Sequence, residues 1–167
     1  MDAGLIGLGD VLRDPEDVCA RLRSSVYGLT QVTVSKDRDL VALKLELDPW
    51  PPMAAEGYPS ETVHIWVRRD GHIVAVPAQA GARTWNHLNG GIVATLCLWY
   101  PEDERALQWN WADGLEQYVT IVHRHLMGEE YFRRHGRWPW DETPHGDGPH
   151  PPPSFVTQIA ARKWQES

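Results

Sequence analysis

Alternating apolar and polar residues between positions 29 and 76 constrain the fold of this chain more than any other feature. Apolar side chains occupy every second position over 43–47 and 63–67, mostly with polar or charged side chains between them. A period of two residues is typical of a strand that buries one face. Shorter stretches over 29–34 and 73–76 are also expected to be strands. Polar turns join the outer pairs, so we predict a four-stranded antiparallel meander. These turns are 36–39 and 70–71.

A helix is expected before the first strand. Asp14 is a favoured capping residue, and Pro15 suits the first position of a helix. Val18, Leu22 and Val26 follow at helical spacing, which indicates one buried face.

A second helix is expected to begin after a capping residue, Asp113. Its apolar residues form one stripe: Leu115, Tyr118, Val119, Val122 and Leu126. We expect Gly128 to end this helix and a separate helical piece to follow over 129–135. A last helix, capped by Ser154, is predicted over 155–164.

The remaining segments are predicted loops. Residues 48–60 and 138–153 are rich in proline and glycine. Residues 77–113 show no long periodic pattern, but their tryptophans and apolar run indicate a long ordered loop. The order of elements predicts an α+β fold with helices on one face of the meander. At 167 residues we expect a single domain, 1–167, with a core of about 10–135 and an extension over 136–167.

Composition excludes several functional classes. A net charge of −7 argues against nucleic-acid binding, which needs clustered lysine and arginine. No stretch is long and apolar enough for a membrane span, and the N-terminus lacks the features of a secretory signal. Two distant cysteines do not form a disulfide framework, which fits a cytoplasmic protein. The GLIGLG run has no strand before it, so we do not expect a dinucleotide cofactor there.

Cys97 is open to two interpretations. It lies in the stretch NHLNGGIVATLCLW, residues 86–99, between two leucines of an apolar run. That setting is typical of a buried structural thiol. Its position at the end of the long loop, before a helix, also suits a nucleophile. The second cysteine, Cys19, falls within the first predicted helix and is expected to be a small core residue.

The histidines do not predict a metal site. His123 and His125 are two residues apart on a helix, so their side chains point in different directions and cannot share a metal from one side. No set of cysteines and histidines has zinc-ligand spacing. We therefore expect neither a metal nor a cofactor.

With this order of elements, the segment around Cys97 resembles the ubiquitin-conjugating enzymes, specifically their bacterial relatives. In that family a His-Pro-Asn motif follows a four-stranded meander, and the catalytic cysteine lies eight residues after the Asn. Here His87-Leu88-Asn89 stands in the motif's place, and Cys97 lies eight residues after Asn89. Leu88 departs from the family's proline. The likeness covers about residues 10–135, where Trp109 or Trp111 fits a later tryptophan of the family and 113–127 its central helix.

The resemblance implies a UBC-like fold with an active-site loop and thioester chemistry. Cys97 would be the nucleophile, and the Asn89 amide would stabilise an oxyanion or brace the loop. His87 would shape the loop or act in catalysis. Asp103 could assist the attacking amine, as could its acidic neighbours at 102 and 104. His145 could approach the site if the extension folds back.

The resemblance also implies partners. Stand-alone bacterial relatives of this size accompany a cGAS-like nucleotidyltransferase in the anti-phage operons called CBASS. The expected substrate is therefore a protein with a C-terminal glycine tail, either such a nucleotidyltransferase or a ubiquitin-like protein. A separate activating enzyme is a possible further partner, because the chain has no room for an adenylating domain. The alternative is a non-catalytic scaffold of the same fold that binds a partner's tail.

Overall fold

The structure, a computed structural model, describes residues 4–99 and 108–140. Asp103, His145 and the predicted helix over 155–164 lie outside these residues. The helices of the described part are α1 (Leu8–Arg13), α2 (Pro15–Ser25), α3 (Pro51–Ala55), the 3-10 helix η2 (Trp111–Asp113) and α4 (Leu115–His135). The strands are β1 (Leu29–Lys36), β2 (Leu40–Leu47), β3 (Glu61–Arg68), β4 (Ile73–Pro77), β5 (Leu88–Asn89) and β6 (Thr95–Leu96).

The predicted four-stranded antiparallel meander is confirmed. The strands lie in the order β1-β2-β3-β4, and each pairs with its neighbour in antiparallel register. Leu45 is opposite Val63, and Ile65 is opposite Ala75. All four side chains are almost completely buried. The alternating residues of the sequence therefore form one continuous apolar face of the sheet.

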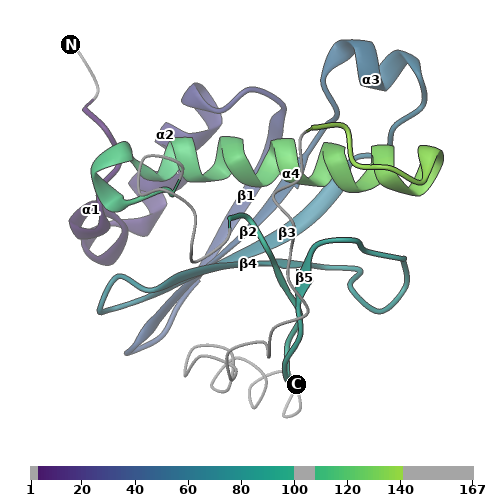
Figure 1. The fold of residues 1–167 in the computed structure, drawn as a ribbon. Helices are drawn as coiled ribbons and strands as arrows, with labels where there is room; N and C mark the ends of the chain where they lie inside the picture. Colours follow the sequence, from purple (N-terminus) through teal and green to yellow (C-terminus); the bar gives the residue numbers. More distant parts are fainter. Residues whose placement is uncertain (1–3, 100–107, 141–167) are drawn as a thin grey trace.

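Helices cover that face of the sheet. The fold is therefore a mixed α+β fold, in which helices pack on an antiparallel sheet. Figure 1 shows α4 lying across the sheet, with α1 and α2 near its N-terminal end. Apolar residues of these helices form a single core with the inner face of the sheet. The predicted apolar stripe of α4 belongs to this core. Its residues are at most 1% exposed: Leu115, Tyr118, Val119, Val122 and Leu126.

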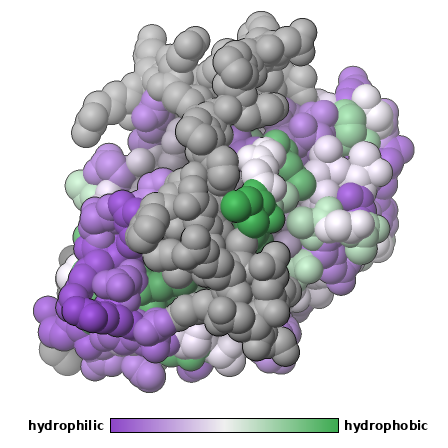
Figure 2. All heavy atoms as spheres, turned by 90° about the horizontal axis from the view of Figure 1, so that it is seen from below, coloured by the Kyte–Doolittle hydropathy of each residue, from purple (hydrophilic) through white to green (hydrophobic). Residues whose placement is uncertain are grey.

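A smaller apolar cluster lies on the opposite face of the sheet. It is centred on Trp66 and Val76, which are 3% and 7% exposed, and Val93 packs against them. Viewed from below, the described residues that are visible include both hydrophilic and hydrophobic ones (Figure 2). Because Val93 belongs to the segment between β5 and β6, this cluster ties that segment to the sheet.

The predicted start of α2 is confirmed. An Asp14 carboxylate oxygen accepts the backbone N–H of Asp17 at 3.1 Å, and Pro15 is the first helical residue. A capping side chain of this kind satisfies one of the donors that a helix leaves unpaired at its start. The short helix α1 before it was not predicted, because six residues carry too little periodicity.

Three other details of the prediction are wrong. The segment 48–60 contains a helix, α3, which two prolines at its start favour. Asp113 does not cap α4 but ends η2, and α4 begins at Leu115 with Gly114 as its cap. Gly128 does not end α4, which continues to His135 and stops at Gly136, a glycine with φ of +68°. The expected helical piece over 129–135 is therefore the last part of α4.

The described part of the long segment after β4 contains some regular structure. It contains the two-stranded antiparallel sheet β5-β6, and η2 follows further along the chain. None of the helices in the described part of the chain is long and apolar enough to cross a membrane.

Candidate active site

His87 and Cys97 lie opposite each other in the β5-β6 hairpin. Leu88 pairs with Leu96 and Asn89 with Thr95. The ladder extends one residue further, because the backbone N–H of Cys97 donates to the carbonyl of His87 at 3.0 Å. Directly opposed residues of an antiparallel pair place their Cβ atoms about 5 Å apart on the same face. The hairpin thus brings His87, Asn89 and Cys97 together.

Cys97 combines features of both interpretations of the sequence. Its neighbours belong to the core, since Leu96 is buried and Leu98 packs against the main cluster. The cysteine itself is only half-buried, and its Sγ lies 3.8 Å from the carbonyl oxygen of Trp99. Cys19, by contrast, is buried in α2, and burial raises the pKa of its thiol. The two cysteines therefore differ in access, and Cys97 is the more accessible.

Asn89 is held by its cross-strand partner. Its side-chain nitrogen donates to the Thr95 hydroxyl at 3.4 Å, a long hydrogen bond. A weak bond of this kind fixes the amide loosely, so a modest rotation of the side chain can redirect its N–H groups.

The side chain of His87 is buried against α4. Its Nδ1 lies 3.7 Å from an oxygen of Glu129, and its ring is 4.3 Å from that of Trp138, edge to face. The side-chain amide nitrogen of Asn86, Nδ2, lies 2.9 Å from Nδ1 of His87. His87 therefore anchors the hairpin to the helix.

Glu129 connects α4 to the start of the hairpin. One carboxylate oxygen accepts the backbone N–H of His87 at 2.7 Å, and the other accepts that of Asn86 at 2.8 Å. Its side chain is completely buried, and His125 Nε2 lies 3.5 Å from it. Burial opposes ionisation, but contacts with His125, Asn86 and His87 hold the pKa of this carboxyl below its ordinary value. Glu129 is thus a buried carboxylate with donors on both oxygens.

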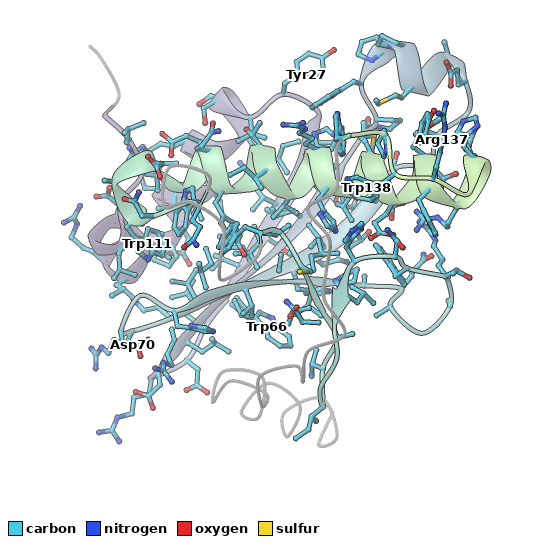
Figure 3. All side chains as sticks on the ribbon, viewed as in Figure 1. Tyr27, Trp66, Asp70, Trp111, Arg137 and Trp138 are labelled. Carbon is cyan, nitrogen blue, oxygen red and sulfur yellow. The ribbon has the colours of Figure 1, made fainter. Side chains whose placement is uncertain are left out.

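The chain beyond α4 covers this cluster. After Gly136 the chain turns back along the helix (Figure 1), and Trp138 reaches both His87 and His125, at 4.3 and 5.3 Å between ring centroids. Figure 3 shows Trp138 beside α4 and Trp66 on the other side of the sheet. A Cβ at Gly128 would lie 2.5–2.8 Å from the rings of Trp138 and Trp140. Because Gly128 has no side chain, the two tryptophan rings can pack directly against α4 at this position.

Arg133, near the end of α4, holds residues that lead into the hairpin. Arg133 donates to the Thr84 carbonyl at 3.3 Å, and its guanidinium lies 5.1 Å from the centre of the Trp85 ring. It also lies 3.5 Å from Glu61, a buried residue that pairs with Arg83. Residues 84–87 therefore each contact α4, and Arg83 is linked to it through Glu61.

His123 and His125 occupy different environments, as the sequence indicated. His123 packs edge to face on Trp50, with ring centroids 5.5 Å apart, whereas His125 contacts Trp138 and Glu129. Within residues 4–99 and 108–140, no three His, Cys, Asp or Glu side chains are grouped so as to hold a metal ion.

Sequence reasoning missed Glu129, although a signal was present. The apolar stripe of α4 runs through Val122 and Leu126, and position 129 is the next on it. A glutamate on a buried stripe needs partners, because an unpaired buried charge is costly. The expected helix end at Gly128 concealed this signal. Trp138 was missed because its position depends on how the chain turns after α4.

No family model matches the chain, and a search of the curated proteins found no similar sequence. A functional assignment must therefore come from the chemistry of the hairpin and its surroundings.

Proposed function

We propose that this chain has a UBC-like fold and is a bacterial ubiquitin-conjugating-like transferase, with Cys97 as its thioester-forming nucleophile. One observation carries the proposal: Cys97 and His87 pair directly in a short ladder. That pairing unites the three residues that the family resemblance names. The half-buried state of Cys97 supports it further, because a nucleophile must meet its substrate.

The proposed reaction has two steps. The Cys97 thiolate attacks the activated C-terminal carbonyl of a protein, a thioester forms, and the leaving group departs. An amine, usually a lysine, then attacks the thioester. The C–S bond breaks, an amide forms, the amine loses a proton and the thiolate is released. In each step the carbonyl oxygen becomes an oxyanion. The side-chain amide of Asn89 would stabilise this oxyanion once its hydrogen bond to Thr95 is broken.

The proposed substrate is a protein with a C-terminal glycine. A cGAS-like nucleotidyltransferase of an anti-phage operon, or a ubiquitin-like protein, would supply this tail in the cytoplasm. A separate enzyme would activate its carboxylate. We assign no cofactor or metal to the reaction.

A synthetic glycine-terminated peptide thioester tests the proposal without an activating enzyme. Incubation should add the mass of one acyl group to the native protein, and excess thiol should remove it. Cys97→Ala should abolish the adduct, whereas Cys19→Ala, the matched control, should keep it. A Cys97→Ser or Cys97→Lys variant would give a stable ester or amide. An adduct that persists in Cys97→Ala, or none on the native protein, would refute thioester formation at Cys97.

The contact between Asn89 and Thr95 favours the alternative, a non-catalytic scaffold that binds a partner's tail, because it engages the proposed oxyanion donor. Thiol alkylation separates the two functions. A transferase should carry a Cys97 thiol that iodoacetamide modifies in the native protein, whereas an inert Cys97 would support the scaffold.

A further inference from the structure

We propose that Glu129 is a positioning residue for Cys97, an inference that rests on the proposed transferase function. Its two carboxylate oxygens accept the consecutive backbone N–H groups of Asn86 and His87. His87 in turn accepts the backbone N–H of Cys97 through its carbonyl. Two hydrogen bonds in series therefore connect the C-terminal half of α4 to the backbone of the nucleophile.

This connection restrains the backbone where the local sequence has no proline to do so. A proline at position 88 would fix the backbone just after His87, since its ring locks φ, but the residue there is Leu88. The strand is only two residues long, and a pair of such short strands has little stability of its own. Glu129 restrains the same backbone from outside, immediately before the strand.

The surroundings of Glu129 suit this role. Hydrogen bonds to a charged acceptor are short and strong, and the two bonds here are 2.7 and 2.8 Å. His125 contacts the carboxylate from the preceding turn of α4, and Trp138 packs on both His87 and His125. The carboxylate is therefore contacted by two imidazoles, and the Trp138 ring packs on both of them.

The test compares two carboxylates of α4 that accept backbone N–H groups. Glu129→Gln keeps the shape but replaces one acceptor oxygen with an NH2 group, which cannot accept from an amide. Glu116→Gln makes the same change where the side chain accepts the backbone N–H of Ile6, at 3.0 and 3.3 Å, at the other end of the helix. Each variant is mixed with the glycine-terminated peptide thioester, and the rate of acylation of Cys97 is measured.

We expect Glu129→Gln to lower the acylation rate about 100-fold, the effect of a displacement of about 1 Å at a reacting group. Glu116→Gln should stay within about threefold of the native rate. Alkylation of the buried Cys19 reports unfolding in the same samples, and it should remain slow in both variants. A native rate in Glu129→Gln, or an equal loss in both variants, would overturn the inference.

Hydrogen exchange of the native protein provides a second test that needs no variant. The amide hydrogens of Asn86 and His87 should exchange much more slowly than those of Gly90 and Gly91 between the two strands. Fast exchange at Asn86 and His87 would overturn the inference. If the native protein is not acylated, the proposed function fails, and this exchange measurement alone decides whether Glu129 fixes the hairpin.

Discussion

Replacement of Gly28 by alanine should destabilise the protein strongly, because two separate constraints meet at this position. Gly28 lies between α2 and β1 and has φ of +79°, a conformation that L-residues rarely adopt. A Cβ there would lie 2.8 Å from the carbonyl oxygen of Asp48 and 2.8 Å from Cε1 of His123. The first neighbour is backbone and the second is a buried ring of α4, so neither moves easily.

The expected cost is the sum of two effects. Left-handed backbone costs an alanine about 1–2 kcal/mol, and overpacking costs about 1–3 kcal/mol. The free energy of unfolding should therefore fall by about 2–5 kcal/mol, which lowers Tm by roughly 4–20 °C for a chain of this size. Gly9→Ala is the matched control. Gly9 lies in α1, and a Cβ added there would meet no neighbouring atom within 4 Å, so alanine should stabilise that helix by about 0.5–1 kcal/mol.

Urea unfolding followed by tryptophan fluorescence measures both changes, since the chain contains nine tryptophans. If Gly28→Ala left the midpoint unchanged or raised it, the contact with Asp48 and His123 would be wrong. If Gly9→Ala lowered the midpoint as much as Gly28→Ala, the loss would reflect alanine in general and not this site.

Three further predictions follow from single contacts. Asp14→Ala should lower the free energy of unfolding by about 1 kcal/mol in urea, because it removes the cap on the Asp17 N–H, and an unchanged midpoint would contradict the cap. Burial lowers the pKa of His123 below its ordinary value of 6.5. As the pH falls, this histidine is therefore protonated in the unfolded chain before it is protonated in the folded protein. The free energy of unfolding should consequently decrease below about pH 6.5. Urea unfolding at several pH values should show a less steep decrease for His123→Gln. An equally steep decrease in the variant would refute the role of His123. In native protein, iodoacetamide should modify Cys97 well before Cys19, whose thiol is buried and has a raised pKa, and mass spectrometry of digests would show any reversed order.

The sheet could be predicted because its pattern is local. Residues 43–47 and 63–67 alternate strictly enough to fix which face is buried, and a shift of one residue would expose every leucine and valine. The start of α2 was equally local, since Asp14 and Pro15 adjoin the residues that they cap.

The candidate site could be predicted only in part, because its contacts join distant segments. The spacing of His87, Asn89 and Cys97 was visible in the sequence, but Glu129 reaches Asn86 across 43 residues. The end of α4 was wrongly predicted at Gly128 because many helices end at a glycine. Here the glycine is needed for the close approach of two tryptophans, a tertiary contact that no local rule contains.

The most direct test of the central claim measures the discharge of a thioester from Cys97. Protein preloaded with the glycine-terminated peptide is mixed with free lysine, and the loss of the acyl adduct is followed by mass spectrometry. Asn89→Ala should slow discharge about 100–1000-fold by removing an oxyanion donor, whereas Thr95→Val, which removes only the partner of Asn89, should not. If Asn89→Ala discharged at the native rate, or if the native thioester did not transfer to lysine, the account of this site as a transferase centre would be contradicted.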